Sequence, residues 1–455
     1  MQTETDGLPP ERRRWAILAL AVAIAMAVMD SSIANVALPA IAADLRVSAS
    51  EAILVVNAYQ IAIVCSLLPL ASLGELVGHE RIYRTGLALF VVASCFCAMA
   101  DSLTWLTLSR IVQGFGAAGL MSVNTALLRF IYPQSRLGQG VGINALVVAL
   151  SSVTGPSVAA GILSIAHWPW IFAVNIPVGL LAFILAWRFL PETPRARRRF
   201  DAASALLSAA TFGMTMTAFE QFTHGAPAWR GSLLLAGGVT AGILLVRRQS
   251  GRAAPLLPVD LLRIPVFSLS VATSICSFAA QMLAFVALPF FLQHSLGRTQ
   301  VETGLLMTPW PLVLIVMSPL AGRLSDRIPA GLLGGIGLIV MATGLALLAT
   351  LPAAPTALDI GWRTALCGMG FGLFQSPNNR ALLSAAPRER SGGASGMLST
   401  ARLLGQTTGA TLAALVLRLA GENGAAVALT VAACIAGAAA VISFTRLAGR
   451  RPGAA

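Results

Sequence analysis

Two charged side chains, Asp30 and Arg110, lie well inside long apolar stretches of the sequence. A carboxylate placed in hydrocarbon costs roughly 2.5–3.5 kcal/mol on insertion scales, so such a residue indicates a functional site. Because burial disfavours the charged form of a carboxylate, Asp30 is predicted to hold either a proton or a cationic substrate. The alternative is a structural acid whose charge is satisfied by Ser31, Ser32 and their neighbours.

Arg110 cannot lose its proton at physiological pH, so its guanidinium must either be paired or face water. On a helix, Gln113 and Gly114 would follow on the same face, at i+3 and i+4. Asp30 and Arg110 lie at similar distances from the outer ends of their apolar stretches, which predicts a shared depth. The alternative is an arginine that stabilises helix packing by donating to backbone carbonyls.

Glu220 is the only other acid at the end of an apolar stretch. It is predicted to be an interfacial residue, with a second cation site as the alternative. The four histidines are scattered among predicted loops and the six cysteines lie in apolar stretches, so neither a metal site nor a disulfide framework is expected. The sequence holds no Walker loop, which excludes ATP as the energy source.

The composition sets the environment of these residues. Of 455 residues, 56% are apolar and only 11% are charged, against about 25% charged in an average soluble domain. The mean hydropathy of +0.79 agrees with this, so a soluble enzyme is excluded and an all-α, polytopic membrane protein is predicted. The net charge of +13 comes from arginines in short clusters, which do not form a nucleic-acid-binding patch.

Fourteen apolar stretches approach the ~20 residues that a helix needs to cross a membrane. They lie near residues 15–38, 51–71, 84–100, 103–128, 140–165, 170–190, 202–222, 231–246, 266–292, 303–320, 331–351, 363–385, 394–417 and 425–445. With the N-terminus inside, the inside segments and their flanks hold 25 of the 31 arginines, Arg402 among them, and the outside segments hold five. This asymmetry is typical of cytoplasmic loops, so both termini are predicted to be cytoplasmic.

Two inside loops share a pattern half a chain apart. Glu75 in the loop 71–81 and Asp326 in the loop 322–327 each follow a small residue by four positions, with basic residues close by. Each loop joins the second and third of six spans if the seventh and eighth spans are an insertion. Two six-span halves are typical of secondary transporters with a substrate site between the halves. The predicted arrangement is 6+2+6, with an N-terminal bundle at 1–190, two inserted helices and their linkers at 191–260, and a C-terminal bundle at 261–455.

Four motifs carry a resemblance to a known family. Residues 30–39 read D-S-S-I-A-N-V-A-L-P, similar to L-D-x-T-I-V-N-V-A-L-P, and the loop 71–81 is similar to G-x-L-A-D-R-x-G-R-[RK]. Residues 110–118 match R-x-x-Q-G-x-G-A-A, and residues 155–160 read G-P-S-V-A-A, similar to G-P-x-x-G-G. The chain therefore resembles the fourteen-span drug:proton antiporter branch of the major facilitator superfamily, over its whole length.

The resemblance implies roles for the matching residues. Proton coupling and substrate binding would involve Asp30, Asn35, Arg110 and Gln113, with Glu220 as a further candidate. The gating loops would use Glu75, Gly78, Arg81, Gly322, Asp326 and Arg327. Gly155 and Pro156 would form the antiporter motif that seals the proton path. The first gating loop departs from the pattern, because Glu75 replaces an aspartate and His79-Glu80 replaces two basic residues. Its ion-pair latch is expected to be weaker than that of Asp326.

The leading hypothesis is a proton-driven antiporter that exports lipophilic, cationic drugs or biocides across the inner membrane. It would act as a monomer, with protons, a small-molecule substrate and membrane lipid as partners, and without cofactor, metal or nucleic acid. The alternatives within transport are an exporter of a native metabolite with drugs as incidental cargo, and a proton symporter of the same fold. A membrane-embedded enzyme or a passive channel would require clustered His, Asp or Cys residues or repeated filter loops, which the sequence lacks.

Overall fold

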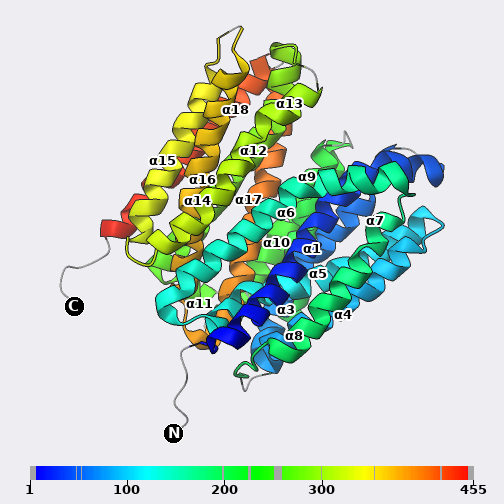
Figure 1. Ribbon diagram of the computed structural model, residues 1–455, viewed down its shortest axis with the longest axis vertical. Coiled ribbons are helices and arrows are strands. Elements are labelled where there is room, and N and C mark those ends of the chain that lie inside the picture. Colours follow the sequence, from blue (N-terminus) through cyan, green and yellow to red (C-terminus); the bar gives the residue numbers. More distant parts are fainter. Residues whose placement is uncertain are drawn as a thin grey trace.

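The computed structural model describes nine stretches of the chain. They are residues 7–47, 49–52, 54–196, 199–223, 227–250, 259–298, 300–352, 354–420 and 423–448. Within these stretches the secondary structure is helical and contains no strands. The long helices form two groups that lie side by side in Figure 1, one coloured mostly blue to green and the other yellow to red.

The first half of the bundle is formed by α1 to α8. Its elements are α1 (Pro10–Asp44), α2 (Ala49–Ala52), α3 (Leu54–Val77), α4 (His79–Ala98), α5 (Leu103–Ile131), the 3-10 segment η1 (Gln134–Arg136), α6 (Leu137–Ile165), α7 (Trp170–Ala173) and α8 (Asn175–Phe189). α1 begins at Pro10, whose fixed φ and missing N–H suit the first turn of a helix. α5 begins after Ser102, whose side chain accepts a hydrogen bond from the backbone N–H of Trp105.

The second half repeats this order of long helices. Its elements are α12 (Pro265–Phe290), the π segment η2 (Phe291–Ser295), α13 (Gln300–Met307), α14 (Pro309–Leu324), α15 (Ala330–Ala349), α16 (Ala357–Ala385), the 3-10 segment η3 (Arg388–Arg390), α17 (Ser391–Ala420) and α18 (Gly424–Ala448). The side chain of Thr356 caps α16 by accepting from the backbone N–H of Asp359. The 3-10 segments η1 and η3 each lead directly into a long helix that packs against the opposite half.

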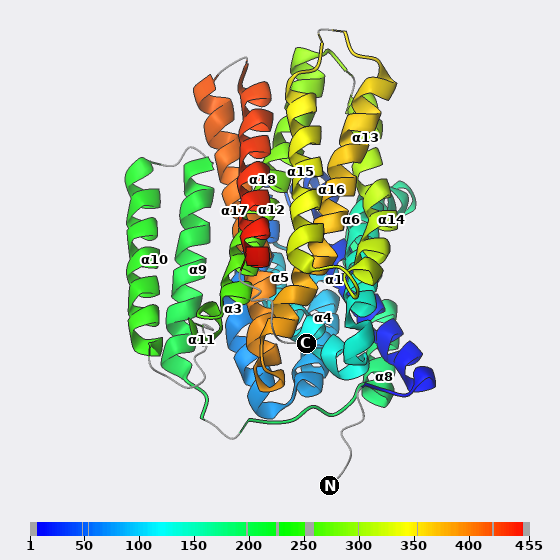
Figure 2. The same ribbon diagram turned by 90° about the vertical axis from the view of Figure 1, so that its left-hand side faces the viewer.

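Two helices stand between the halves in sequence and beside them in space. α9 (Ala202–Thr223) and α10 (Ala228–Gln249) pack against each other, and α9 also contacts α3 and α17. Figure 2 shows the pair as a layer at the left edge of the bundle. The short α11 (Val259–Leu262) then leads back to α12. The pair therefore lies at the periphery of the two halves.

Ten helical segments in the described part of the chain are long and apolar enough to cross a membrane. The four remaining long helices, α6, α9, α16 and α17, fall outside that set. α16 is less apolar because it carries charged and amide side chains, Asp359, Arg363, Asn378 and Arg380 among them. The finding indicates an integral membrane protein and leaves the predicted number of fourteen spans as a hypothesis.

Close helix contacts recur at matching positions in the two halves. A Cβ on Gly116 of α5 would lie 2.6 Å from the backbone nitrogen of Phe90 in α4. A Cβ on Gly370 of α16 would lie 2.3 Å from the backbone nitrogen of Met341 in α15. Because real Cβ atoms do not approach that closely, only glycine permits either helix pair to pack at this distance. The repeated Gly-x-Gly pattern relates residue 114 to 368 and 116 to 370.

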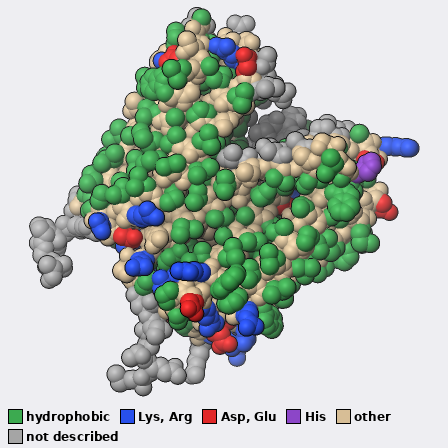
Figure 3. Space-filling view, viewed as in Figure 1, with side chains coloured by type: hydrophobic (Ala, Val, Ile, Leu, Met, Phe, Trp, Pro, Cys, Tyr) green, Lys and Arg blue, Asp and Glu red, His purple; other side chains and the backbone are tan. Residues whose placement is uncertain are grey.

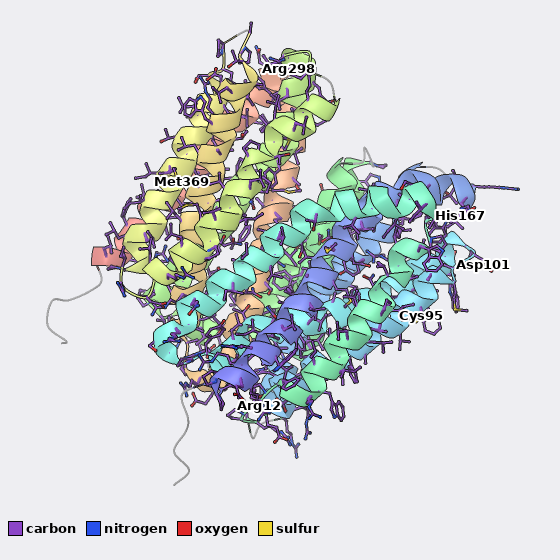
Figure 4. All side chains as sticks on the ribbon, viewed as in Figure 1. Arg12, Cys95, Asp101, His167, Arg298 and Met369 are labelled. Carbon is purple, nitrogen blue, oxygen red and sulfur yellow. The ribbon has the colours of Figure 1, made fainter. Side chains whose placement is uncertain are left out.

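Charged side chains are gathered at one end of the bundle on the side shown in Figure 3. The end where α1 begins and α18 ends, here called the terminal face, carries the blue and red side chains at the bottom of Figure 3, above which apolar side chains cover the flank. Arg12 lies at this face, whereas His167 and Arg298 lie toward the opposite face (Figure 4). Between the halves, α6 packs on α14 and α3 packs on α17.

Candidate functional site

A buried ion pair joins α1 and α5. Nη1 of Arg110 lies 2.5 Å from Oδ2 of Asp30, and the two side chains are 0% and 1% exposed. Nε of Arg110 also donates to the carbonyl oxygen of Val55 at 3.3 Å. Asp30 and Arg110, which the sequence predicts to lie at a similar depth, are thus in direct contact. The guanidinium is paired as its permanent charge requires.

Three further polar side chains surround this pair. The amide nitrogen of Gln113 donates to Oδ1 of Asp30 at 3.0 Å and to the hydroxyl of Ser94 on α4 at 2.9 Å. The amide nitrogen of Asn175, at the start of α8, donates to the same Asp30 oxygen at 2.7 Å. The carboxylate therefore accepts three side-chain hydrogen bonds from two different helices, which satisfies a charge that would otherwise be costly to bury.

Tyr59 of α3 separates the ion pair from the centre of the molecule. The guanidinium carbon of Arg110 lies 3.9 Å from the centroid of the Tyr59 ring, a cation–π contact. The Tyr59 hydroxyl donates to the carbonyl oxygen of Ala27 at 3.2 Å, which fixes the ring against α1. Tyr59 also lines the central cavity, whereas Asp30 and Arg110 do not. The charged pair thus lies behind Tyr59, outside the cavity lining.

The cavity lies between the two halves and measures about 880 Å³, within the size range of sites that hold drug-sized ligands. Its wall from the second half is aromatic, with Phe278, Phe285, Trp310 and Phe371. Trp310 packs on Gly368 as Tyr59 packs on Gly114, so the two residues occupy matching positions in the two halves. The inserted helix α9 contributes Met216 to the lining.

Arg402 is the one charged side chain among the described residues that line this cavity. The arginine count from the sequence placed Arg402 with the inside segments, whereas in the structure it lies within α17, on the wall of the cavity. Arg402 follows Ser391, the first residue of α17, by eleven positions and lies within the helix. The start of α17 is rich in glycine and serine, a composition typical of loops, but these small residues allow the helix to pack closely on α3.

Two acids connect the halves at the terminal face. Oε2 of Glu75 lies 2.9 Å from Nη1 of Arg390, and Oε1 accepts from the backbone N–H of Gly393 at 2.7 Å. Oδ1 of Asp326 lies 3.1 Å from Nε of Arg380 and accepts from the backbone N–H of Gly138 at 3.2 Å. Each acid thus meets the first turn of a helix in the opposite half, where unpaired N–H groups favour an anion.

Arg390 also contacts Asp260, whose Oδ2 lies 3.0 Å from its Nε. Burial alone would lower the pKa of the Arg390 guanidinium, but the neighbouring carboxylates of Glu75 and Asp260 outweigh it and raise the pKa above its usual value. Arg390 therefore remains cationic between two acids.

The other predicted gating residues have different surroundings. Gly78 adopts φ +109°, a conformation that favours glycine, and lies directly before α4 as its N-cap residue. A Cβ on Gly322 would lie 2.6 Å from the carbonyl oxygen of Gly138, so this glycine permits α14 to approach α6. The side chains of Arg81 and Arg327 are exposed. The arginines that contact the two acids are Arg390 and Arg380, whereas Arg81 and Arg327 were the arginines predicted for the gating loops.

Gly155 of the antiporter motif is buried within α6. The side chains of Asn35, Pro156 and Glu220 lie outside the part of the structure that is described. Their predicted roles stay predictions. Among the described residues there is no group of three or more His, Cys, Asp or Glu side chains that could hold a metal ion.

The repeats show which chemistry is restricted to one half. The sequence Val-Ala-Leu-Pro occurs at 36–39 in α1 and at 286–289 in α12, which relates Asp30 to Ala280. The Gly-x-Gly repeat relates Arg110 to Thr364 in the same way. The second half therefore has no counterpart of the ion pair, although it supplies most of the aromatic wall and Arg402.

The chain matches the family described as Major Facilitator Superfamily over residues 20–410, with a second match over residues 271–454. The chain belongs to the major facilitator superfamily. It is 56% identical to "Uncharacterized transporter YebQ" of Escherichia coli (strain K12) over 98% of both chains. It is 30% identical to "Riboflavin transporter RibZ" of Clostridioides difficile (strain 630) over 86% of both chains.

Other members of the superfamily agree with this assignment. The chain is 28% identical to "Multidrug export protein EmrB" of Haemophilus influenzae, over 87% of this chain and 78% of that protein. Its fold is similar to that of the human organic anion transporter MFSD10, with a TM-score of 0.71 at 15% identity, covering 96% of this chain and 100% of the other. The protein is thus an integral membrane transporter of the superfamily and not an enzyme.

Sequence reasoning missed Asn175, Tyr59 and Arg390 as partners of the predicted site residues. Asn175 follows an aromatic segment and Tyr59 lies in an apolar stretch, so neither stands out locally. Arg390 could have been found by the repeat Pro-x-x-Arg, which occurs at 133–136 and at 387–390 immediately before α6 and α17. The repeat indicates equivalent helix starts, each facing an acid of the other half.

Proposed function

We propose that this transporter is a proton-driven antiporter that exports a lipophilic small molecule, with Asp30 as the proton carrier. The observation that carries the proposal is the buried pair Asp30–Arg110, whose guanidinium lies against the ring of Tyr59, a residue that lines the central cavity. A titratable group inside the membrane is by default a candidate for a proton path. The cavity would take the substrate, so proton and substrate occupy neighbouring but distinct sites.

The proposed coupling runs through Tyr59. When Asp30 is protonated it no longer supplies the negative charge that holds Nη1 of Arg110. The guanidinium can then change its position against the Tyr59 ring, which forms part of the cavity wall. Substrate in the cavity and a proton on Asp30 would thereby favour different arrangements of α1, α3 and α5. Each charge moved across the membrane is worth ~2.3 kcal/mol per 100 mV, which can drive export.

The contacts between the two halves at the terminal face support an outward-facing state of this cycle. Glu75 and Asp326 hold the halves together there, and Nη1 of Arg129 on α5 donates to the carbonyl oxygen of Ala386 at 2.9 Å and to the hydroxyl of Ser391 at 3.1 Å. The cavity lining includes Met307 of α13, toward the opposite face. We propose that the terminal face is cytoplasmic, and that these contacts open when the transporter faces inward.

The proposed topology has fourteen spans arranged 6+2+6 in the inner membrane, with both termini cytoplasmic. The peripheral position of α9 and α10 supports their interpretation as an insertion at 191–260 between bundles at 1–190 and 261–455. Reporter fusions after Arg195 and after Pro227 test it, because α9 lies between them. The first should report the cytoplasm and the second the periplasm. Both reporting the same side would contradict the count.

The lipophilic substrate is supported by the aromatic and methionine lining, and export by the relative named as a multidrug export protein. A second candidate is export of a native metabolite, which is favoured by the relative named as a riboflavin transporter. A proton symporter of the same fold is the third. Gly155 and Pro156 would distinguish it, since we propose that this part of α6 seals the proton path of an antiporter. The protein is proposed to act as a monomer.

The test is uphill dye efflux from proteoliposomes under an imposed pH gradient. Wild-type protein should no longer move the dye uphill when the pH gradient is dissipated. Asp30→Asn should lose gradient-driven transport of the dye at matched protein levels. Asp101→Asn serves as the control, because this acid is exposed near the opposite face. Normal uphill pumping by Asp30→Asn would move the proton carrier elsewhere, with Glu220 as the next candidate.

A further inference from the structure

Arg402 is half-buried and, unlike the buried arginines Arg110, Arg129 and Arg446, has no oxygen partner among the described residues. Arg129 and Arg446 donate to backbone or side-chain oxygens, and Arg110 faces Asp30. By contrast, Nε of Arg402 has no hydrogen-bond partner among the described residues, and its Nη2 lies 3.9 Å from the sulfur of Met121. The guanidinium nevertheless carries five N–H donors and a permanent charge. A cation in this environment is costly until an anion or oxygen acceptors reach it.

Arg402 lies where two spaces meet. It lines the large cavity and also a small polar chamber of about 50 Å³. The chamber is lined by amide and hydroxyl side chains, Asn124, Asn144, Gln375, Asn379 and Ser399. The amide groups among them can donate to an anionic oxygen that is held by the guanidinium, whereas the hydroxyl of Ser399 donates to the carbonyl oxygen of Met121 at 3.2 Å. The chamber thus offers a charged group and neutral donors at one end of an aromatic cavity.

No carboxylate belongs to the described lining of either space. Asp30, the acid that the sequence analysis offered as a ligand for a cationic substrate, lies behind Tyr59 and is already paired with Arg110. A cationic substrate in the cavity would therefore meet Arg402 without an available counter-charge. An anionic substrate would pair with Arg402, and a planar carboxylate would match the fork of its donors.

We infer that the cavity selects an aromatic organic acid, whose rings pack between Tyr59 and the aromatic wall and whose carboxylate pairs with Arg402. The inference rests on the proposed function in so far as the cavity is the substrate site. It names the class of cargo, and reverses the sign of charge expected from the sequence. The amides of Gln60, Gln281 and Gln406 on the cavity wall would bind polar substituents of the rings.

The test compares two dyes built on the same xanthene rings, the anionic fluorescein and the cationic rhodamine 6G. Binding to purified full-length protein in detergent is measured by fluorescence polarisation. Wild-type protein should bind fluorescein at least tenfold more tightly than rhodamine 6G. Arg402→Gln should weaken fluorescein binding at least tenfold and reduce the preference, whereas Arg402→Lys should retain part of it because the charge remains. Arg323→Gln, an exposed arginine at the end of α14, is the matched control and should bind as wild type.

Folding and transport are checked separately. Size-exclusion profiles and thermal unfolding of Arg402→Gln show whether a loss of binding reflects misfolding, and Arg402→Lys supplies the folded comparison. Equal binding of both dyes by wild type, binding of neither, or equal weakening of both by Arg402→Gln overturns the inference. Asp30→Asn should still bind fluorescein. If Asp30→Asn pumps normally while the dye preference holds, proton carriage by Asp30 fails and the charge selectivity stands.

Discussion

Glu75 and Asp326 lie 251 positions apart in the chain, and each accepts a hydrogen bond from a backbone N–H in the first turn of a helix in the opposite half. The two acids therefore link the halves by the same physical device, a carboxylate at a helix N-terminus. They differ in burial, since the Glu75 side chain is 1% exposed and that of Asp326 is 18% exposed. From the sequence, the Glu75 loop is expected to form the weaker latch, but the burial of Glu75 favours the opposite order.

Glu75→Gln is expected to weaken closure of the terminal face more than Asp326→Asn. Removing one partner of a buried pair costs about 3–5 kcal/mol, whereas a partly exposed pair contributes about 0–1 kcal/mol. Hydrogen exchange of the first turn of α17 should rise in Glu75→Gln, and that of α6 should rise less in Asp326→Asn. Glu192→Gln, an exposed acid in the linker, is the control. Equal exchange in both variants would show that burial does not set the strength of the latch.

Asp30→Asn and Arg110→Gln should each lower thermal stability, because each leaves the other residue of the buried pair without its counter-charge. The expected loss is about 3–5 kcal/mol for a single variant. The double variant should recover part of that loss, since two neutral amides remove the unpaired charge. Thermal unfolding in detergent gives the double-mutant cycle, and additive losses would contradict a direct pair. Proton-driven transport should be absent in all three variants.

Much of this site could be predicted from residue types alone, because a charge in an apolar stretch is visible in sequence. That is how Asp30, Arg110 and the two half-chain loops were found. The partners could not be predicted, because Tyr59, Asn175 and Arg390 contact the site residues from helices or loops that are far away in the chain. In the first loop, His79-Glu80 replaces two basic residues of the family pattern, and from the sequence this replacement indicated only a weaker motif. In the structure, Glu80 binds the linker that leads to the inserted helices.

Thr193→Val tests that linker. The backbone N–H and the hydroxyl of Thr193 donate to Oε2 of Glu80 at 3.1 and 2.7 Å, and the backbone N–H of His79 donates to the Thr193 hydroxyl at 2.8 Å. Valine keeps the shape but leaves buried polar groups unpaired, at about 1–3 kcal/mol. Trypsin cleavage after Arg195 should therefore become faster. Thr85→Val is the control, because the Thr85 hydroxyl bonds only within its own helix. Unchanged cleavage would mean that Glu80 does not hold the linker.

Tyr59→Phe and Tyr59→Ala separate the two roles of this ring. Phenylalanine keeps the face over Arg110 and loses only the hydrogen bond to Ala27, which contributes about 1 kcal/mol. Alanine also removes the cation–π contact and opens the wall between the ion pair and the cavity. Tyr59→Phe should stay coupled, and Tyr59→Ala should leak protons without substrate. Proton influx into proteoliposomes, followed with a pH-sensitive dye, measures this. If the Tyr59→Ala variant does not leak protons, other residues form the wall between the ion pair and the cavity.

The matching glycine contacts give the last prediction. Gly116→Ala and Gly370→Ala would each drive a methyl group into the backbone of the neighbouring helix, at 2.6 and 2.3 Å in the present packing. Overpacking of this kind costs about 1–3 kcal/mol, so both variants should unfold at lower temperature. Gly437→Ala is the matched control, because a Cβ there meets nothing within 4 Å. It should be neutral or stabilising by up to about 1 kcal/mol, since alanine is the better helix former. If Gly116→Ala and Gly370→Ala unfold at the same temperature as the wild type, the helix pairs can separate at no cost. The close packing of α4 on α5 and of α15 on α16 would then not be required for the fold.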